Sequence, residues 1–211
     1  MRVLVAGANG NTGTRIVRLL PGQGHQARAL IRDPDQAPAL EELGADTVVA
    51  DLEGDVAHAV RGCDAVMYAA GAGPGSGAAK KVTVDEQGAV KLVEAALELG
   101  ARRYVMLSTM GADDPGSGSE RMRPYFEAKA RADEALRDSG LDFTIVRPGR
   151  LTDEPGRGTV DAAVSLDRSG EVSRDDVAAT MVAALDIDTT VGTTFELLSG
   201  DVPIAQALAA L

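Results

Sequence analysis

The sequence predicts an α/β protein built on a doubly wound parallel sheet, and three observations predict that class. Short apolar runs alternate along the chain with segments whose apolar residues recur at helical spacing. A glycine-rich turn joins the first apolar run to the first helical pattern. The chain has 211 residues, 45% of them hydrophobic and 25% charged, which is typical of one soluble domain. We therefore expect a single domain over residues 1–211.

The individual elements follow from the alternation of these patterns. The first strand begins directly after Met1 and ends at a turn over residues 7–13, and helical spacing continues through residue 20. Further strands are predicted over residues 26–31, 46–50, 65–69, 103–107 and 142–146, and helices over residues 38–43, 55–60, 82–99 and 120–139. Gly100 and Gly140 lie where helix C-caps belong.

The alternation fails after Gly149. Residues 151–170 are rich in glycine, aspartate and arginine and predict no regular element. Ser173 then caps a helix that runs to about Leu185, followed by a strand over 194–198 and a final helix over 204–211. Residues 150–211 are expected to form a short substrate-side loop and C-terminal elements, while the glycine-rich residues 71–77 form a loop after the fourth strand. That loop lies at the carboxyl edge of the sheet, where open parallel sheets bind ligands.

The turn over residues 7–13 has the form G-x-x-G-x-x-G, which is typical of a dinucleotide site. Gly7 permits the tight turn, Gly10 lets the backbone approach a diphosphate, and Gly13 lets the helix pack on the strand. The helix N-terminus behind the turn offers unpaired amides to the phosphates. The predicted cradle comprises Gly7, Ala8, Asn9, Gly10, Asn11, Thr12 and Gly13. The alternative is an ordinary mobile loop.

The end of the second strand predicts which dinucleotide binds. Arg32 stands where a guanidinium meets the 2′-phosphate of NADP, whereas NAD sites place an acidic residue there. Asp33 follows directly, but Pro34 turns it away, so NADP is favoured over NAD. The alternative for Arg32 is a solvated turn residue. Asp51, followed by Leu52, is placed to accept from the adenine amino group; its alternative is an N-cap.

A second constellation, Tyr125 and Lys129, suits acid–base chemistry. Residues at i and i+4 share a helix face, so the Lys129 ammonium is expected to lower the pKa of the Tyr125 phenol. Ser108, at the end of the fifth strand, is placed to hold a carbonyl oxygen. The alternative is a structural tyrosine with a ribose-binding or exposed lysine.

Composition excludes several other functions. A net charge of −11 argues against a nucleic-acid partner, and no apolar stretch is long enough to span a membrane. His25 and His58 are isolated and are expected at the surface, so no metal site or serine–histidine triad is predicted. Cys63 is expected to be a small buried residue. With one cysteine and a strand that leaves no room for a signal peptide, a cytoplasmic location is expected.

Seven stretches distributed over nearly the whole chain resemble the atypical branch of the short-chain dehydrogenase/reductase superfamily, the small NAD(P)H-binding, NAD-dependent epimerase/dehydratase-like proteins. These are VAGANGNTG at 5–13, YAAG at 68–71, VDEQGA at 84–89, YVMLS at 104–108, YFEAKA at 125–130, SGLDFTIVRPG at 139–149 and SRDDVA at 173–178. The glycine spacing is similar to that of extended and atypical members, whereas classical members have a longer gap between the first two glycines.

The resemblance implies a Rossmann fold, NADP binding and catalytic roles for Ser108, Tyr125 and Lys129, with Asp85 where classical members have an asparagine. It also implies that Lys129 holds the ribose of the cofactor. The further cofactor contacts that it implies are Ala69, Ala70, Gly71 and Pro148.

The leading hypothesis is therefore a short-chain oxidoreductase that transfers a hydride between NADP(H) and a small carbonyl, quinone or similar acceptor. Arg150 and Arg157 are placed to attract an anionic substrate, or are ordinary surface charges. The alternatives are a non-catalytic NADP(H)-binding redox sensor and a nucleotide-sugar epimerase or dehydratase. The expected partner is a small-molecule substrate, and the chain is expected to be a monomer or homodimer.

Overall fold

The computed structural model describes residues 1–73 and 75–211, and its strands form one large sheet and one small sheet. The large sheet contains β1 (Arg2–Ala6), β2 (Gln26–Ile31), β3 (Asp46–Val49), β4 (Ala65–Tyr68), β5 (Arg103–Leu107), β6 (Asp142–Pro148), β8 (Thr159–Ala163), β10 (Thr193–Ser199) and β11 (Val202–Pro203). The small sheet pairs β7 (Arg150–Thr152) with β9 (Glu171–Ser173).

The helices lie between these strands in the chain. They are α1 (Asn11–Leu19), α2 (Ala37–Glu41), α3 (Ala57–Val60), α4 (Gly77–Lys80), α5 (Ala89–Leu99), α6 (Arg123–Arg137), α7 (Arg174–Ala184) and α8 (Ile204–Ala209). A π-helical segment, Lys81–Gly88, leads into α5, and 3₁₀ turns occupy Leu20–Gln23, Pro34–Gln36, Pro115–Ser117 and Asp188–Thr190.

The large sheet confirms the predicted α/β class. Its order is β11-β8-β10-β6-β5-β4-β1-β2-β3, and every pairing from β3 to β10 is parallel. Only β8 and β11, at one edge, run antiparallel to their neighbours. The order reverses at β1, because β2 lies on one side of it and β4 on the other. This switch point at the carboxyl ends of the strands is where doubly wound sheets bind ligands.

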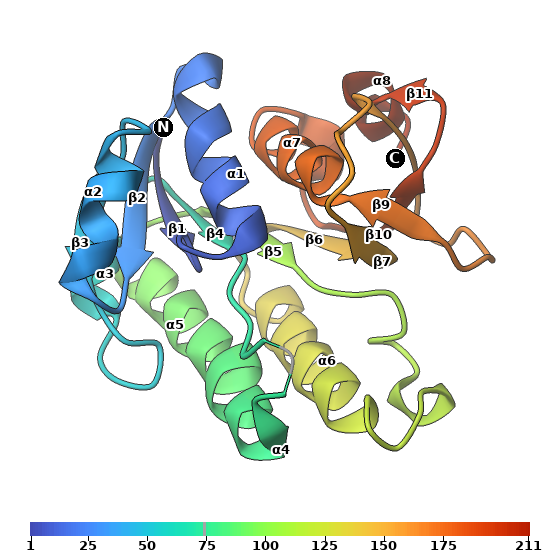
Figure 1. Cartoon of the computed structure of the whole chain (residues 1–211), viewed down its shortest axis with the longest axis horizontal. Helices are drawn as coiled ribbons and strands as arrows, with labels where there is room; N and C mark the ends of the chain where they lie inside the picture. Colours follow the sequence, from blue (N-terminus) through green and yellow to red (C-terminus); the bar gives the residue numbers. More distant parts are fainter. Residues whose placement is uncertain (74) are drawn as a thin grey trace.

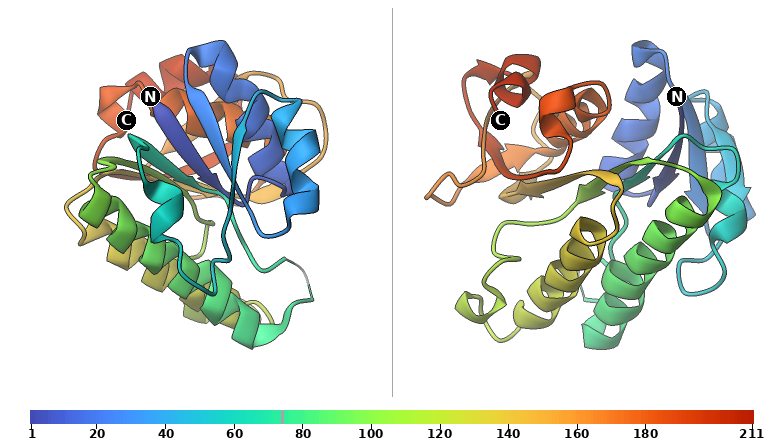
Figure 2. Two further views of the ribbon diagram at one scale, coloured as in Figure 1. Left: turned by 90° about the vertical axis from the view of Figure 1, so that its left-hand side faces the viewer. Right: turned by 180° about the vertical axis from the view of Figure 1, so that it is seen from behind.

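Helices cover both faces of the sheet, so each face has its own core (Figures 1 and 2). Under α1, α7 and α8 the core contains Ile16 and Phe195, which join the two ends of the chain in one apolar cluster. Under α5 and α6 it contains Tyr68, Leu92 and Leu136. Strands buried on both faces explain why the predicted strands are nearly continuous apolar runs.

The segment after Gly149 differs from the prediction. Residues 151–170 were expected to be irregular, but they contribute β7 and β8 and lead into β9. These strands carry little hydrophobic patterning because they are short and β8 is paired by its neighbours β10 and β11 near the edge of the sheet. The predicted helix cap and final strand are confirmed, since the Ser173 side chain accepts a hydrogen bond from the Asp176 amide and β10 spans the expected residues.

Two further expectations need correction. The predicted helix over 82–99 begins earlier, at α4, and contains the π-helical segment before α5. Of the glycine-rich loop predicted over residues 71–77, the structure describes every residue except Pro74, which lies outside the described residues. His25 is buried rather than at the surface, with Nε2 3.0 Å from Asp186 Oδ2, whereas His58 is exposed and Cys63 is buried as expected. Among the described residues no helix is both long and apolar enough to cross a membrane.

Candidate functional site

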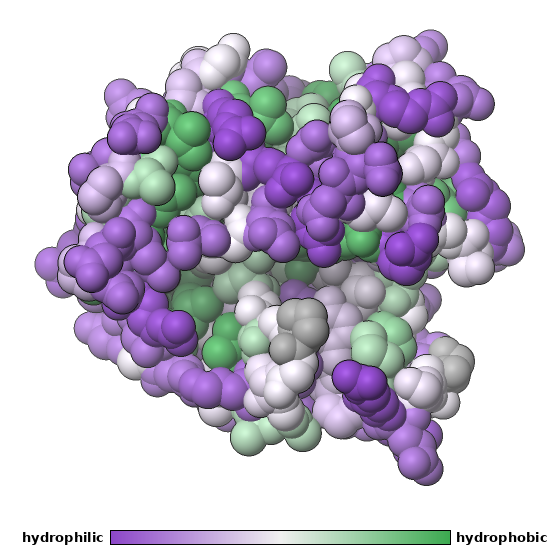
Figure 3. Space-filling view, in the orientation of Figure 1, coloured by the Kyte–Doolittle hydropathy of each residue, from purple (hydrophilic) through white to green (hydrophobic). Residues whose placement is uncertain are grey.

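A cavity of about 1280 Å³ opens at the carboxyl ends of β1, β2, β4 and β5. It exceeds the roughly 300–1,000 Å³ of ordinary small-molecule pockets, so it offers room for an extended ligand and a second small molecule. Figure 3 shows the hollow across the middle of this face, with apolar surface in its depth and hydrophilic residues above it. Most of the predicted cofactor and catalytic residues line this cavity.

The glycine turn forms one wall of this cavity, and its backbone requires glycine at two positions. Gly7 has a φ of +82°, and a Cβ there would lie 2.7 Å from the backbone of Ala70. A Cβ on Gly13 would lie 2.0 Å from the carbonyl oxygen of Gly7. The tight turn expected at Gly7 and the close helix packing expected at Gly13 are both present.

The start of α1 suits the phosphates of a dinucleotide. Gly10 is the N-cap residue and supplies no side-chain hydrogen bond, while its carbonyl accepts from the Thr14 amide at 2.9 Å. The preceding amides of the first turn, including those of Asn11 and Thr12, have no intrahelical acceptor. Unpaired amides at a helix N-terminus are favourable for an anion, so a diphosphate fits here.

The members of the predicted cradle divide into two groups. Asn9, Asn11 and Thr12 line the cavity together with Gly7 and Gly10. Ala8 and Gly13 do not line it; both are buried beneath the turn and shape it from behind.

Arg32 lies at the cavity edge where the prediction requires it. Its side chain is exposed, lines the cavity, and forms no hydrogen bond or ion pair within residues 1–73 and 75–211. The adjacent Asp33 directs its carboxylate to the amide of Asp35, at 3.0 Å, where it caps a 3₁₀ turn that begins at Pro34. The acidic neighbour is thus held by its own turn, and the guanidinium is free for a ligand.

Asp51 and Leu52 line the same end of the cavity. The Asp51 carboxylate accepts from the Glu53 amide at 2.9 Å, which fixes the turn after β3. Its alternative role as a helix N-cap is wrong, because α3 begins at Ala57 and the Asp55 carboxylate accepts from that amide at 3.0 Å.

The chain after β4 closes the middle of the cavity, whereas Pro148 at the end of β6 does not line it. Ala69, Ala70 and Gly71 all line it. Pro148, expected beside the cofactor, is buried within β6 in register with Leu197 of β10 and is not among the lining residues. Later residues of that region, Leu151 and Arg174, line the cavity instead.

Lys129 and Asp85 form a buried pair at the floor of the cavity. Lys129 Nζ lies 3.7 Å from Asp85 Oδ1 and donates to the carbonyl oxygen of Leu107 at 3.0 Å. Asp85 has no exposed surface, and its Oδ2 accepts from the Ala72 amide at 3.0 Å. Burial lowers the pKa of Lys129, and the charge of Asp85 opposes that shift. Asp85 lies inside the π-helical segment, and its Oδ1 has no hydrogen-bond partner among the residues that the structure describes.

Tyr125 lines the cavity near Lys129, but its pKa is shifted in the direction opposite to the expected one. Burial raises the pKa of the phenol above its usual range, and the charge of Asp85 raises it further. The Lys129 ammonium is engaged by Leu107 and Asp85 and does not activate the phenol. Lys81 Nζ lies 5.1 Å from the centroid of the Tyr125 ring. Tyr125 is therefore a protonated phenol at neutral pH and a weaker acid than a free tyrosine.

Ser108 is bound to a second buried charge pair that sequence patterns did not reveal. Its hydroxyl donates to Asp133 Oδ2 at 2.8 Å, and Arg147 Nη2 lies 3.0 Å from the same oxygen. Asp133 has no exposed surface. Because the hydroxyl hydrogen points to the carboxylate, Ser108 presents a lone pair to the cavity. The expected donation to a carbonyl oxygen requires this bond to break.

Comparison with known families identifies the family of the chain that contains this cavity. The model of the NAD(P)H-binding family matches residues 7–188, which include the glycine turn and the residues of the cavity floor. The chain belongs to the NAD(P)H-binding family.

Relatives within and around the NAD(P)H-binding family support this assignment over the full length. The chain is 45% identical over 212 aligned residues to a Bacillus subtilis protein named uncharacterized sugar epimerase YhfK, covering 99% of each. Its structure is similar to a putative NAD-dependent epimerase/dehydratase from Bacillus halodurans, with 43% identity, full coverage of both chains and a TM-score of 0.97. It is also similar to the oxidoreductase ylbE from Lactococcus lactis, with 29% identity, coverage of 100% and 96%, and a TM-score of 0.90.

Arg150 and Arg157, proposed from the sequence as anionic-substrate attractors, do not line the cavity of this NAD(P)H-binding protein. Each is an exposed surface charge paired with an acidic residue, Glu171 and Asp201 respectively. Two residues at the site were not predicted from the sequence: Asp133, one helical turn beyond Lys129, which accepts from Ser108, and Arg174, which lines the cavity. The spacing Tyr125, Lys129, Asp133 on one face of α6 is the signal that would have found Asp133.

Proposed function

We propose that this protein is an NADP(H)-dependent oxidoreductase that reduces a small carbonyl, quinone or similar acceptor. The bound nicotinamide supplies the hydride. The glycine turn and the first amides of α1 hold the diphosphate, and the residues after β4 support the middle of the cofactor. Tyr125 and Ser108 line the part of the cavity left for the acceptor.

The preference for NADP rests on one observation, that the Arg32 guanidinium has no hydrogen-bond or ion-pair partner among the described residues. A free, exposed guanidinium at the cavity edge suits a phosphate, which it can bind bidentately. A ribose 2′-hydroxyl needs an acceptor, and the nearest candidate, Asp33, is committed to the Asp35 amide. Both facts favour the 2′-phosphate of NADP.

The proton of the reduction comes from Tyr125. The phenol is protonated at neutral pH and can donate to an oxygen that gains negative charge as hydride arrives, although its raised pKa makes it a weaker acid than a free tyrosine. Lys129 adds a positive charge to the floor of the cavity. Because the Ser108 hydroxyl donates to Asp133, it can donate to the oxygen of a carbonyl or quinone only after that bond breaks.

The engagement of Lys129 also favours a second candidate, a redox sensor that binds NADP(H) without turnover. A lysine held by Leu107 and Asp85 does not lower the pKa of Tyr125. Epimerisation is less well supported, although the Bacillus subtilis relative is named a sugar epimerase. It begins with removal of a proton from a sugar hydroxyl, and a phenol with a raised pKa is a poor base for that step.

The experiment is a comparison of wild type and Tyr125→Phe in two assays. Calorimetry measures NADPH and NADH binding, and absorbance follows NADPH oxidation with aldehydes, ketones, quinones and flavins. We expect NADPH to bind more tightly than NADH, and Tyr125→Phe to slow carbonyl reduction by about 10²–10⁴-fold without weakening NADPH binding. Glu127→Gln, at a neighbouring α6 position outside the cavity lining, is the control.

The outcomes separate the candidates. Tight NADPH binding with no turnover of any acceptor overturns the oxidoreductase and leaves the sensor. Turnover that survives Tyr125→Phe means hydride transfer without that acid, as a quinone or flavin acceptor allows. Equal affinity for NADH and NADPH overturns the role given to Arg32.

A further inference from the structure

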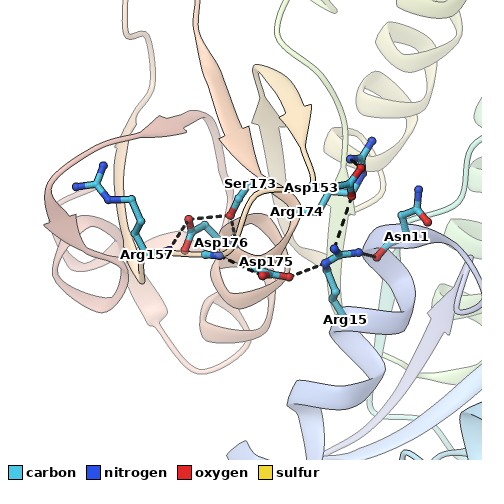
Figure 4. A network of polar contacts seen from close by, with 9 residues as sticks. Asn11, Arg15, Asp153, Arg157, Ser173, Arg174, Asp175 and Asp176 are labelled. Carbon is cyan, nitrogen blue, oxygen red and sulfur yellow. Dashed lines mark hydrogen bonds and ion pairs between the residues drawn. The ribbon is translucent and has the colours of Figure 1, made fainter.

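The C-terminal half of the chain reaches the phosphate cradle through one arginine. Arg174 is the first residue of α7, and its side chain lines the same cavity as Asn11, at the start of α1. Arg174 is largely buried, with 20% of its side chain exposed. Figure 4 shows Arg174 and its carboxylate partner Asp153 beside the N-terminal turn of α1.

Two arginines share one exposed carboxylate at this junction. Asp153 Oδ2 lies 2.9 Å from Arg174 Nη1, and Asp153 Oδ1 lies 3.6 Å from Arg15 Nη2. Arg15 is held independently, since its Nε donates to Asp175 at 2.5 Å and its Nη1 donates to the carbonyl oxygen of Asn11 at 2.7 Å. Arg174 has no other ion pair in the described part of the chain.

Asp153 is a weak partner for Arg174 compared with a phosphate. The Asp153 side chain is 66% exposed, and solvent-exposed ion pairs contribute little because water competes for both charges. A phosphate inside the cavity offers charge-assisted, bidentate hydrogen bonds to a guanidinium. When Arg174 turns to a phosphate, Asp153 keeps Arg15 and solvent, so no buried charge is left unpaired.

The position of Arg174 indicates which of the two phosphates of a dinucleotide would lie next to it. Arg32, Asp51 and Leu52 mark the adenosine end of the cavity on the β2 and β3 side of β1. Arg174 is the first residue of α7, which packs against α1, β5 and β6, on the side of β1 away from β2 and β3. The phosphate that faces Arg174 is therefore the one farther from Arg32.

From these contacts we propose that Arg174 binds the nicotinamide-side phosphate of the dinucleotide and exchanges Asp153 for that phosphate. The inference rests on the proposed dinucleotide site and extends it to a ligand contributed by the C-terminal segment. Binding would then tie residues 150–176 to the cradle, because the arginine that contacts the phosphate also begins α7.

Calorimetric titration of three probes tests this assignment. NADPH and NADH contain both phosphates of the diphosphate, whereas adenosine 2′,5′-bisphosphate contains only the adenosine-side phosphate and the 2′-phosphate. We expect Arg174→Ala to weaken NADPH and NADH binding by the same factor, about tenfold for a charged hydrogen bond, and to leave adenosine 2′,5′-bisphosphate unchanged. Arg32→Ala should weaken NADPH and adenosine 2′,5′-bisphosphate and leave NADH unchanged, so the two roles fail separately.

Asp153→Asn distinguishes a phosphate ligand from a structural bridge. If Arg174 exchanges partners, removing the competing carboxylate should leave NADPH affinity unchanged or raise it a few-fold. If the Asp153–Arg174 pair only anchors the C-terminal segment, Asp153→Asn and Arg174→Ala should weaken NADPH binding alike. That result, or an equal loss of adenosine 2′,5′-bisphosphate affinity in Arg174→Ala, would overturn the proposal.

Two matched control variants allow either outcome to be interpreted. Arg157→Ala removes an arginine of the same segment whose partner, Asp201, is at the surface and away from the cavity lining, so NADPH affinity should not change. Arg174→Lys retains the charge without the bidentate geometry and should fall between wild type and Arg174→Ala. Far-UV circular dichroism and thermal melts of each ligand-free variant establish that it is folded before titration.

Discussion

The buried charges at the cavity floor determine what each polar side chain offers a ligand. Lys129 is directed at Asp85 and the Leu107 carbonyl, and Ser108 is directed at Asp133. Two buried carboxylate oxygens, one on each aspartate, have no hydrogen-bond partner in the described residues. Asp133 does not line the cavity, whereas Asp85 does, so the free Asp85 oxygen is the one that a ligand with a hydrogen-bond donor can satisfy.

The close approach of Gly13 to Gly7 leads to a prediction about the stability of the fold. Gly13→Ala places a methyl group 2.0 Å from the Gly7 carbonyl oxygen, so α1 must move away from the turn. We expect a loss of about 1–3 kcal/mol in the free energy of unfolding in urea, together with weaker NADPH binding.

Gly22→Ala is the matched control for that change. A Cβ on Gly22 meets no atom within 4 Å, and Gly22 does not have a positive φ. Its stability should change little or rise slightly, because alanine restricts the unfolded chain. Equal losses for the two variants would mean that the close approach of Gly13 to Gly7 is unimportant.

At the scale of elements, α1 and α7 are joined by packing and by charge. Both contribute to one apolar core, and Arg15 on α1 binds Asp175 in the first turn of α7. Asp175 also accepts from the Gly156 amide at 3.1 Å, so it holds the segment before β8 as well (Figure 4). One aspartate therefore connects the dinucleotide half of the chain to its C-terminal segment.

The pKa of Asp175 leads to a prediction about pH. The hydrogen bond from Arg15 and then that from Gly156 lower the pKa of this carboxyl below its usual value. A carboxylate whose pKa is lower in the folded than in the unfolded state contributes stability above pH about 4, and that contribution is lost as pH falls through the lowered pKa. We expect Asp175→Asn to reduce the unfolding free energy at pH 7 by about 1 kcal/mol or less, because the side chain is half exposed.

Urea midpoints measured from pH 7 to pH 3 check this prediction. The difference between wild type and Asp175→Asn should be constant at neutral pH and should shrink in acid. Asp138→Asn, at the exposed C-cap position that follows α6, is the control measured in the same way. A gap that widens toward acid would contradict the role of Asp175.

At the scale of the whole molecule, the two ends of the chain share one core. Val5 and Ile16 from the first elements lie in the same cluster as Val177 and Phe195 from the last ones. The sheet is continuous from β3 to β11. This continuity supports cooperative unfolding of residues 1–211 as one unit.

Phe195→Ala tests that cooperativity. Phe195 is fully buried on β10, and deleting its ring should lower the unfolding free energy by about 3–5 kcal/mol. If the molecule is one unit, hydrogen exchange of β1 amides and far-UV circular dichroism should report the same loss. Val164→Ala, at a position 74% exposed, should have little effect. β1 amides that keep wild-type protection in Phe195→Ala would instead indicate two separately unfolding parts.

The α/β class, the strand at each apolar run and the glycine turn could all be predicted from the sequence, because they depend on local patterns. Gly7, Gly13 and the caps at Ser173 and Gly100 are where local chemistry requires them. The position of Arg32 was also readable, since it follows directly from the end of β2.

The pairing of charges at the site depends on contacts between residues far apart in the sequence, so it became known from the folded structure. Asp85 and Lys129 lie on different helical segments, and Asp133 of α6 meets Ser108, which follows β5, and Arg147 of β6. Such pairings reverse the expected pKa shift of Tyr125, because burial and the Asp85 carboxylate act on the phenol while Lys129 is engaged elsewhere. The strands after Gly149, and the arrival of Arg174 at the cradle, depend likewise on partners far away in the sequence, which no local pattern contains.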